Sequence, residues 1–211
     1  MKTKKNKSTK KTWIQYGIIA VVAITLFATG LHAEVIGFAQ RGLLATGLMN
    51  PNVEVAAQPE LDESGREVGT RTMSELPKAD FNLELMDKDG NTRSLEDLKG
   101  KVIFMNLWAT WCPPCIAEMP SIEKLYKEMG QEVAFVMLSL DRNFETAKAF
   151  DKKKGYNLPI YAPASSLPAM YQSSSIPTTY VIDADGNLAW SHKGMADYSD
   201  SDFKEFLNSL R

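Results

Sequence analysis

The feature that most constrains the fold of this chain is a Cys-x-x-Cys motif between an apolar run and an amphipathic segment. Cys112 and Cys115 are the only cysteines among the 211 residues. Residues 102–108, which precede them, are apolar except for Asn106, as is typical of a strand buried on both faces. After them, apolar residues recur at steps of three and four as far as Met129, which predicts a helix. We therefore predict a strand, a tight turn and a helix, with Cys112 at the end of the turn.

This position gives the two thiols a chemical role. The first turn of a helix carries unpaired backbone N–H groups and the positive end of the helix dipole, and both stabilise a thiolate. Pro114 fits this turn because proline has no N–H to lose. Cys115, one turn further on, can close a disulfide with Cys112. The motif therefore predicts a redox-active Cys112–Cys115 pair.

Two other uses of the cysteines stay open. A structural disulfide across so short a loop removes little entropy from the unfolded chain, so it stabilises the fold only weakly. A structural zinc site needs four ligands, and the only histidines, His32 and His192, lie far from the pair in the sequence. Copper(I) held by two thiolates is the metal site that fits best. We predict no bound metal and no cofactor.

Several motifs resemble the thioredoxin superfamily and, more narrowly, its membrane-anchored TlpA/ResA-like thiol-disulfide oxidoreductases. They are Trp-Cys-Pro-Pro-Cys at 111–115, then Glu118 and Pro120, and later Ile176-Pro177-Thr178. The resemblance covers residues 75–211. It implies an α/β, thioredoxin-like fold: a central mixed β-sheet flanked by helices, with an added N-terminal β-hairpin. It also implies a cis Ile176–Pro177 bond beside the dithiol, although X–Pro bonds are mostly trans.

One strand position departs from the thioredoxin pattern. Thioredoxins usually carry a buried Asp, which moves protons for the second thiol, where this chain has Asn106. Asn cannot titrate, and TlpA/ResA-like proteins carry an acid at the position of Glu118. Glu118 lies three residues after Cys115, so the two share a helix face. A partly buried Glu118 with a raised pKa could accept the Cys115 proton. The alternative is an exposed glutamate in an ordinary helix pair.

The resemblance also predicts a surface on which substrates dock around the dithiol. Trp111, next to the nucleophile, is expected to border it, and the backbone of Ile176 is expected to pair with an extended substrate segment. Pro177 removes a backbone N–H next to the sulfurs. The predicted docking residues are Trp111, Pro113, Pro114, Ile176 and Pro177.

Together these residues predict an enzyme of thiol-disulfide exchange. Reduced Cys112 attacks a disulfide in a partner protein, Cys115 resolves the mixed disulfide with help from Glu118 or water, and a membrane thiol reductant restores the dithiol. Family members often reduce apocytochrome c before haem attachment.

Three alternatives are a peroxiredoxin-like thiol peroxidase, a copper(I) chaperone of thioredoxin fold and a non-catalytic interaction module. Cysteine spacing disfavours the first two. Thr110 lies two rather than three residues before Cys112, and such copper chaperones separate their cysteines by three residues.

The N-terminus carries a different signal. Every charged residue before Glu34 is a lysine, and residues 13–33 contain no Asp, Glu, Lys or Arg, with His32 as the only basic side chain. A helix of this length spans about 30 Å, the thickness of a bilayer core. We predict a cytoplasmic tail at 1–12 and one transmembrane anchor at 13–33. The catalytic domain would then lie on the periplasmic, extracytoplasmic side of a bacterial inner membrane. The alternative is a cleaved signal peptide, for which Leu31 is a poor residue near the cleavage site.

Residues 34–74 are expected to be a membrane-proximal segment and linker, followed by the thioredoxin-like domain at 75–211. The apolar stretch 34–50 could form a helix on the membrane surface or one packed on the domain or a partner. Residues 51–77 lack periodicity, apart from a candidate strand at Arg71-Thr72-Met73. The net charge is −2, and because lysines gather at the N-terminus, the remaining body is acidic. An acidic body disfavours nucleic-acid binding.

Within the domain, hydrophobic periodicity and turn residues predict the remaining elements. They are a β-hairpin at 81–94, strands at 133–140, 179–182 and 188–192, and helices at 143–154 and 201–210. The strands at 102–108 and 133–140 are joined by a helix, so we expect them to be parallel.

Overall fold

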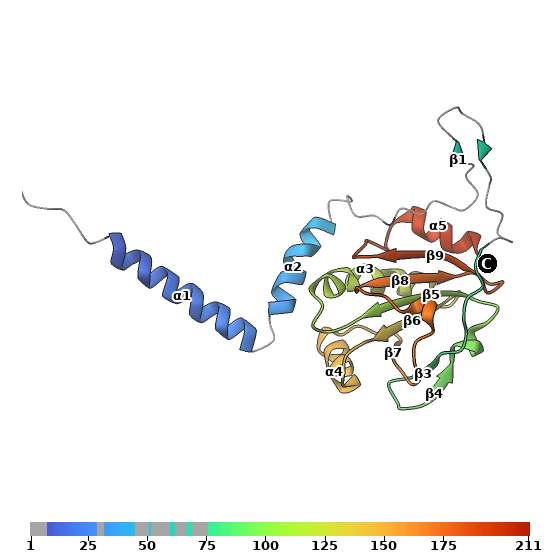
Figure 1. The fold of residues 1–211 in the computed structure, drawn as a ribbon, viewed down its shortest axis with the longest axis horizontal. Helices are drawn as coiled ribbons and strands as arrows, with labels where there is room; N and C mark the ends of the chain where they lie inside the picture. The colour runs from blue at the N-terminus through green and yellow to red at the C-terminus, as the bar shows by residue number, and fades with distance from the viewer. Residues whose placement is uncertain (1–7, 29–31, 45–50, 52–59, 62–66, 69–75) are drawn as a thin grey trace, which may run out of the picture.

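A seven-stranded mixed sheet forms the centre of the C-terminal part of the chain (Figure 1). The computed structural model describes all residues except 1–7, 29–31, 45–50, 52–59, 62–66 and 69–75. The strand order is β4-β3-β7-β6-β5-β8-β9. The strands are β3 (Glu84–Met86), β4 (Thr92–Ser94), β5 (Val102–Trp108), β6 (Val133–Ser139), β7 (Ile160–Pro163), β8 (Thr178–Ile182) and β9 (Leu188–Lys193). The helical elements of this part are α3 (Pro113–Met129), α4 (Phe144–Lys154), α5 (Ser201–Ser209) and the 3-10 turns η2 (Leu95–Leu98) and η3 (Ala169–Tyr171).

Strand β5 leads directly into the Cys-x-x-Cys motif and is central to the sheet. It pairs in parallel with β6 and antiparallel with β8, and β6 pairs in parallel with β7. Helix α3 connects β5 to β6, and α4 connects β6 to β7, so both crossovers move in the same direction across the sheet. Because such crossovers are right-handed, α3 and α4 lie on the same face. This topology confirms the predicted parallel pair and the mixed sheet of a thioredoxin-like fold.

Both faces of β5 are buried, because alternate side chains point into two different cores. One core packs against α3, α4 and α5, and its β5 members are Val102, Phe104 and Trp108. The other lies on the opposite face and includes residues of β3, η2 and η3, and its β5 members are Ile103, Met105 and Leu107. Every residue of β5 is buried, as its apolar sequence predicted.

Most predicted elements of the domain have the predicted type. The strand predicted at 102–108 is β5, with the same bounds. The added hairpin is formed by the antiparallel strands β3 and β4. Asn143 precedes α4 as its N-cap residue, and its side-chain oxygen accepts a hydrogen bond from the Glu145 N–H at 3.0 Å. The predicted helix therefore begins one residue later than its sequence pattern, because Asn favours the cap.

The N-terminal helix differs from the single membrane span predicted at 13–33. Helix α1 covers Ser8–Ala28 and includes Lys10 and Lys11, so its apolar part is only Thr12–Ala28. Within the described residues, no single helix is long and apolar enough to cross a membrane. The pair Thr12–Ala28 and Ala33–Leu44, bent by 98°, meets the criteria of length and composition together. One unbroken anchor helix is therefore not confirmed.

Helix α2 (His32–Leu44) lies beside α3 (Figure 1), and the residues that meet the domain are small or apolar. Ala33 belongs to the core shared with α3 and α4, and Leu44 packs with Ala117 of α3. Gly37 permits the closest approach, because a Cβ atom there would lie 2.9 Å from the Pro113 carbonyl oxygen. We expected residues 34–50 to form a helix either on the membrane surface or packed on the domain or a partner. The described part of this stretch packs on the domain.

The opposite face of α2 is exposed and carries several large apolar side chains. Its exposed large side chains are Val35, Ile36, Phe38 and Leu43. At the helix start, Glu34 forms ion pairs with Lys153 and Lys154 of α4, at 2.9 and 2.8 Å. Helix α2 therefore joins the domain on one side and leaves an apolar surface on the other.

The segment predicted as a linker contains a small two-stranded ribbon. Strand β1 (Glu60–Leu61) pairs antiparallel with β2 (Glu67–Val68). The candidate strand at Arg71-Thr72-Met73 lies outside the described residues.

Candidate active site

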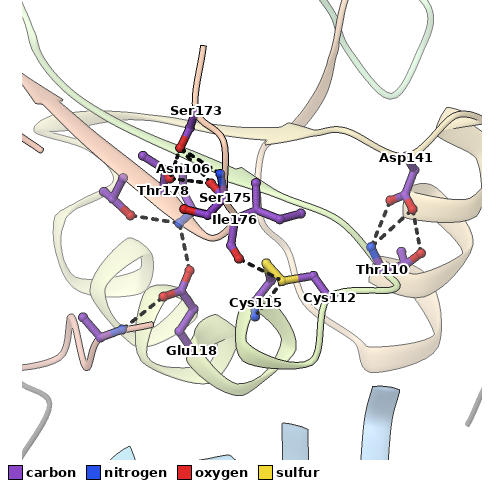
Figure 2. The surroundings of a disulfide bond; sticks show 12 residues. Asn106, Thr110, Cys112, Cys115, Glu118, Asp141, Ser173, Ser175, Ile176 and Thr178 are labelled. Carbon is purple, nitrogen blue, oxygen red and sulfur yellow. Dashed lines mark hydrogen bonds between the residues drawn. A yellow bond between two sulfur atoms is a disulfide. The ribbon is translucent and has the colours of Figure 1, made fainter. Parts of the chain in front are cut away.

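Cys112 is the N-cap residue of α3, and its sulfur is bonded to that of Cys115 (Figure 2). The S–S distance is 2.03 Å. The backbone N–H of Cys115 donates to Cys112 Sγ, with an N···S distance of 3.2 Å. Pro113 and Pro114 occupy the first helical positions, where an intrahelical N–H is not required. The sulfur of Cys112 therefore lies at the positive end of a helix, as the sequence predicted.

The two cysteines differ in their surroundings. Cys112 is 3% exposed and follows Trp111, which is 59% exposed. Cys115 is 0% exposed and belongs to the core. A partner protein can therefore approach the disulfide from the Cys112 side.

A loop with a cis proline faces the disulfide, as the family resemblance implied. The Ile176–Pro177 bond is cis, and the Ile176 carbonyl oxygen lies 3.7 Å from Cys112 Sγ (Figure 2). Hydroxyl groups hold this loop, because Thr178 Oγ1 and Ser173 Oγ donate to the Ser175 carbonyl at 2.7 and 2.8 Å. The backbone of Ile176 is thus fixed beside the reactive sulfur.

Four of the five predicted docking residues lie at this edge with some exposure. Trp111 is the most exposed, Pro113 and Pro114 are half-buried in the first turn of α3, and Ile176 is half-buried in the facing loop. Pro177 is buried behind Ile176. The structure therefore gathers residues from two distant stretches of sequence around Cys112.

Glu118 is fully buried on α3, three residues after Cys115. Its Oε1 accepts a hydrogen bond from Asn106 Nδ2 at 2.8 Å, and its Oε2 accepts one from the Ala196 N–H at 3.2 Å (Figure 2). Burial raises the pKa of Glu118 to about 8, and the two hydrogen bonds offset only part of that effect. The carboxyl group is therefore mostly protonated at neutral pH. The alternative expectation, an exposed glutamate, is wrong.

Asn106 connects Glu118 to further buried polar groups. Its Nδ2 also donates to the hydroxyl of Thr179, its cross-strand neighbour on β8, at 2.9 Å. The hydroxyls of Thr179 and Tyr198 are 2.7 Å apart. Burial, followed by the nearby Glu118 charge, raises the pKa of Tyr198 well above its ordinary value, so this phenol stays neutral. Asn106 thus holds the acid in place instead of titrating itself.

A second carboxylate, Asp141, holds the turn before Cys112. It follows β6 and accepts hydrogen bonds from the backbone N–H of Thr110 at 3.1 Å and the Thr110 hydroxyl at 2.7 Å. The Ser139 hydroxyl donates to it at 2.9 Å. Figure 2 shows this contact on the side of Cys112 away from Glu118.

Sequence reasoning did not identify Asp141, Thr179 or Tyr198. A signal for Asp141 was present, because an acid directly after a parallel strand lies at the same sheet edge as the end of β5. Tyr198 follows β9 and reaches the site only because the chain folds back over α3, and no local pattern marks that path.

Metal-ligating side chains do not gather elsewhere in the part of the chain that the structure describes. Within it, no group of three or more His, Cys, Asp or Glu residues could hold a metal ion. The arrangement around Cys112 supports the making and breaking of the Cys112–Cys115 bond directly.

Comparisons with known proteins agree with this geometry. The Redoxin family pattern matches residues 72–208. The thioredoxin-like protein YneN of Bacillus subtilis is 37% identical over 134 residues, which cover 62% of this chain and 76% of YneN. The thiol-disulfide oxidoreductase ResA of Bacillus cereus is 35% identical over 111 residues, covering 51% of this chain and 63% of ResA.

A solved structure shares the fold. The exposed lipoprotein thioredoxin Etrx1 of Streptococcus pneumoniae superposes with a TM-score of 0.51 at 31% identity, covering 60% of this chain and 98% of that one.

Helix α2 precedes the segment that the family pattern matches.

Proposed function

This chain belongs to the Redoxin family and is a thiol-disulfide oxidoreductase; we propose that it reduces disulfides of partner proteins outside the cytoplasm. The observation that carries the proposal is the contrast between the two sulfurs. Cys112 lies at a helix N-terminus beside the cis-proline loop, and Cys115 lies in the core, three residues before the buried Glu118 on the same helix.

In the proposed reaction, two electrons pass from the dithiol to the partner. The Cys112 thiolate attacks one sulfur of the partner disulfide, and the other partner sulfur leaves as a thiolate. Cys115 then loses its proton and attacks Cys112 Sγ. The bond between Cys112 and the partner breaks, the second partner sulfur leaves and takes up a proton, and the Cys112–Cys115 disulfide remains.

Glu118 is the proposed acceptor of the Cys115 proton. Its pKa of about 8 means that a minor fraction is ionised at neutral pH and can act as a base. After proton transfer, the neutral carboxyl group suits its buried position better than a carboxylate does. Asn106 and the Ala196 N–H hold the carboxyl group for this step.

The docking role proposed for the five residues around Cys112 follows from where they lie. The carbonyl of Ile176 can accept a hydrogen bond from an extended partner segment, which adds that segment as a short strand. Trp111 offers exposed aromatic surface next to the nucleophile. Pro113, Pro114 and Pro177 contribute no N–H donors to this edge.

Membrane attachment is supported by the N-terminal segment. Side chains of α1 are strongly exposed, with Trp13 at 78% and Phe27 at 76%, and the lysines precede them. An apolar surface of this extent needs lipid or a partner. We propose a cytoplasmic tail at 1–12, an anchor within 13–33, a membrane-proximal segment and linker at 34–74 and the catalytic domain at 75–211.

The proposed location is the extracytoplasmic side of a bacterial inner membrane. A reducing dithiol in such an oxidising compartment needs its own electron supply, for which a membrane thiol reductant is the proposed donor. Apocytochrome c is a proposed substrate, on the family resemblance. The relative Etrx1 is described as an exposed lipoprotein, which agrees with an extracytoplasmic site of action.

The reduction potential of the Cys112–Cys115 pair in the full-length protein tests the direction of electron flow. We expect a value near that of thioredoxin, roughly −270 mV, when the pair is equilibrated with a thioredoxin couple. A value near roughly −120 mV, like that of strong periplasmic oxidants, would reverse the proposed direction and make the protein a disulfide donor.

A further inference from the structure

A groove opens beside Trp111, between helices α2 and α4. Its volume is about 340 Å³, and its apolar walls are Ala33 of α2, Trp111, and Ala149 and Phe150 of α4. This volume is at the small end of the roughly 300–1,000 Å³ range of ligand sites. It is large enough for an apolar side chain of a bound polypeptide. Because Trp111 directly precedes Cys112, the groove continues the edge at which the reactive sulfur lies.

The charged groups that line the groove neutralise one another. Glu34 of α2 and Lys153 of α4 both border it and form an ion pair of 2.9 Å. Hydrogen bonds from Lys154 and then Lys153 lower the pKa of Glu34, so this carboxyl group stays ionised and paired. A charged occupant would have to compete with this pair, whereas an apolar occupant would not.

One wall of the groove comes from a segment outside the matched family region. The family pattern begins at residue 72, and α2 ends at Leu44. Helix α2 is held against the first turn of α3, where Gly37 lies so near the Pro113 carbonyl oxygen that a Cβ atom would be only 2.9 Å away. The membrane-proximal segment therefore shapes the surface next to Cys112.

We propose that this groove binds an apolar side chain of the partner polypeptide, close in sequence to the cysteine that Cys112 attacks. The inference rests on the proposed function, because it assumes that the partner is a polypeptide with a disulfide. On one side of Cys112 the Ile176 carbonyl can pair with the partner backbone, and on the other side Trp111 leads into the groove. An extended chain advances about 3.3 Å per residue, so a side chain two or three residues from the attacked cysteine can reach it.

The site would make the enzyme selective among disulfides. A partner with a large apolar residue two or three positions from its cysteine gains contacts with Trp111 and Phe150 in the complex that leads to the mixed disulfide. A partner with a polar residue at that position does not displace water from the groove. Selection would therefore depend on α2 as well as on the thioredoxin-like domain.

The test uses single turnovers of the reduced full-length protein with two synthetic peptide disulfides. The peptides are identical except for a Phe or a Ser two residues from one cysteine. We expect the rate constant for the Phe peptide to exceed that for the Ser peptide by about tenfold, a typical discrimination by an apolar pocket. Equal rate constants for the two peptides would overturn the inference and leave the proposed function intact, whereas no reduction of either peptide would contradict the proposed function itself.

A matched pair of variants on α4 tests whether the preference for the Phe peptide arises in the groove. Ala149 is exposed and lines the groove, so Ala149→Trp should fill it and bring the ratio of the two rate constants close to one. Lys152 is exposed on the same helix and is not among the lining residues, so Lys152→Trp should keep the preference. Loss of the preference in both variants, or in neither, would contradict this location.

A variant of α2 tests the wall from the membrane-proximal segment. Gly37→Val forces α2 away from α3, because the added Cβ atom meets the Pro113 carbonyl oxygen. We expect the preference for the Phe peptide to fall as it does in Ala149→Trp. A Gly37→Val protein with an unchanged preference would show that α2 has no part in the site.

Discussion

The two sulfurs of the disulfide lie one helical turn apart and meet opposite surroundings. Cys112 lies at the surface edge with Trp111 and the cis-proline loop, whereas Cys115 is in the interior, three residues before the buried Glu118 on the same helix. The Cys112 side offers backbone acceptors and apolar surface, and the Cys115 side holds a titratable acid whose pKa burial raises to about 8. A helix start at Cys112 is enough to create this contrast, because the N-cap residue lies outside the helix and a residue three positions later points into the core.

The largest expected effect separates the two cysteines. Cys112→Ser should lower the rate of partner reduction by more than about 10³-fold, because no other thiol is accessible. Cys115→Ser should still attack and should accumulate a mixed disulfide with the partner, since the resolving thiol is gone. Mass spectrometry of the adduct measures both. An adduct on Cys115 in the Cys112→Ser protein would invert the comparison.

The second prediction concerns stability as a function of pH. The pKa of Glu118 rises from its ordinary value of 4.5 to about 8 on folding, so the folded state binds more protons than the unfolded state between these values. Stability from this group is fully present below pH 4.5 and is lost as the pH rises through 8. From pH 5 to pH 8 the wild type should lose about 3 kcal/mol more than Glu118→Gln.

Urea unfolding of both proteins at pH 5 and pH 8 measures this difference. Glu128→Gln, on an exposed position of the same helix, is the control. It removes an ion pair with Lys204 that lowers the pKa of Glu128, so its pH dependence between pH 5 and pH 8 should follow that of the wild type. Parallel pH dependence in all three proteins would mean that Glu118 does not titrate in this range.

The third prediction concerns the step in which Cys115 resolves the mixed disulfide. Glu118→Gln should slow this step by about 10²-fold at pH 7, because the nearby base is removed. In the wild type the rate should rise as the pH passes through the Glu118 pKa of about 8, since the ionised fraction increases. Stopped-flow kinetics on a preformed mixed disulfide follows this step alone. If Glu118→Gln slowed the attack by Cys112 as much as it slowed resolution by Cys115, the effect would be general and not confined to Cys115.

A fourth, smaller effect should appear on the Cys112 side. Asp141→Asn weakens the hydrogen bonds that hold Thr110, so the conformation of the turn before Cys112 becomes less fixed. We expect a loss of stability of about 1.5–3 kcal/mol, as for other hydrogen bonds to charged groups, and a several-fold slower attack. The resolution step should be unchanged. Thermal unfolding and single-turnover rates together test this, and slower resolution with normal attack would be the opposite result.

The smallest effect is expected at the contact between α2 and α4. Glu34→Gln removes the ion pairs with Lys153 and Lys154, which lie near the surface. Such pairs contribute about 0–1 kcal/mol, so the midpoint of thermal unfolding should change by only a few degrees. A large fall in the midpoint would mean that α2 contributes far more to the domain than this contact suggests.

The same contrast explains what the sequence alone could predict. Local pattern determined β5 and the start of α3, because an apolar run followed by Cys-Pro-Pro-Cys leaves few other structures. The family resemblance supplied the cis bond at Pro177 and the acid at Glu118. These features lie within single stretches of sequence, and the structure agrees with them.

Contacts between distant stretches could not be predicted in this way. The bond of Asn106 to Glu118 joins a strand to a helix, and the bonds of Thr110 to Asp141 join the ends of two parallel strands. The packing of α2 on α3 depends on one glycine, Gly37, whose role is visible only when the two helices meet. The single anchor helix was not confirmed, because apolar length alone does not show where α1 ends.

The measurement that tests the division between the two sulfurs most directly is the alkylation rate of each cysteine in the reduced protein. Limited iodoacetamide, followed by peptide mass spectrometry, reports Cys112 and Cys115 separately. We predict that Cys112 reacts at least about tenfold faster at pH 7, because its thiolate lies at the helix N-terminus and at the surface. Equal rates, or faster reaction of Cys115, would contradict the assignment of Cys112 as the sulfur that meets the partner.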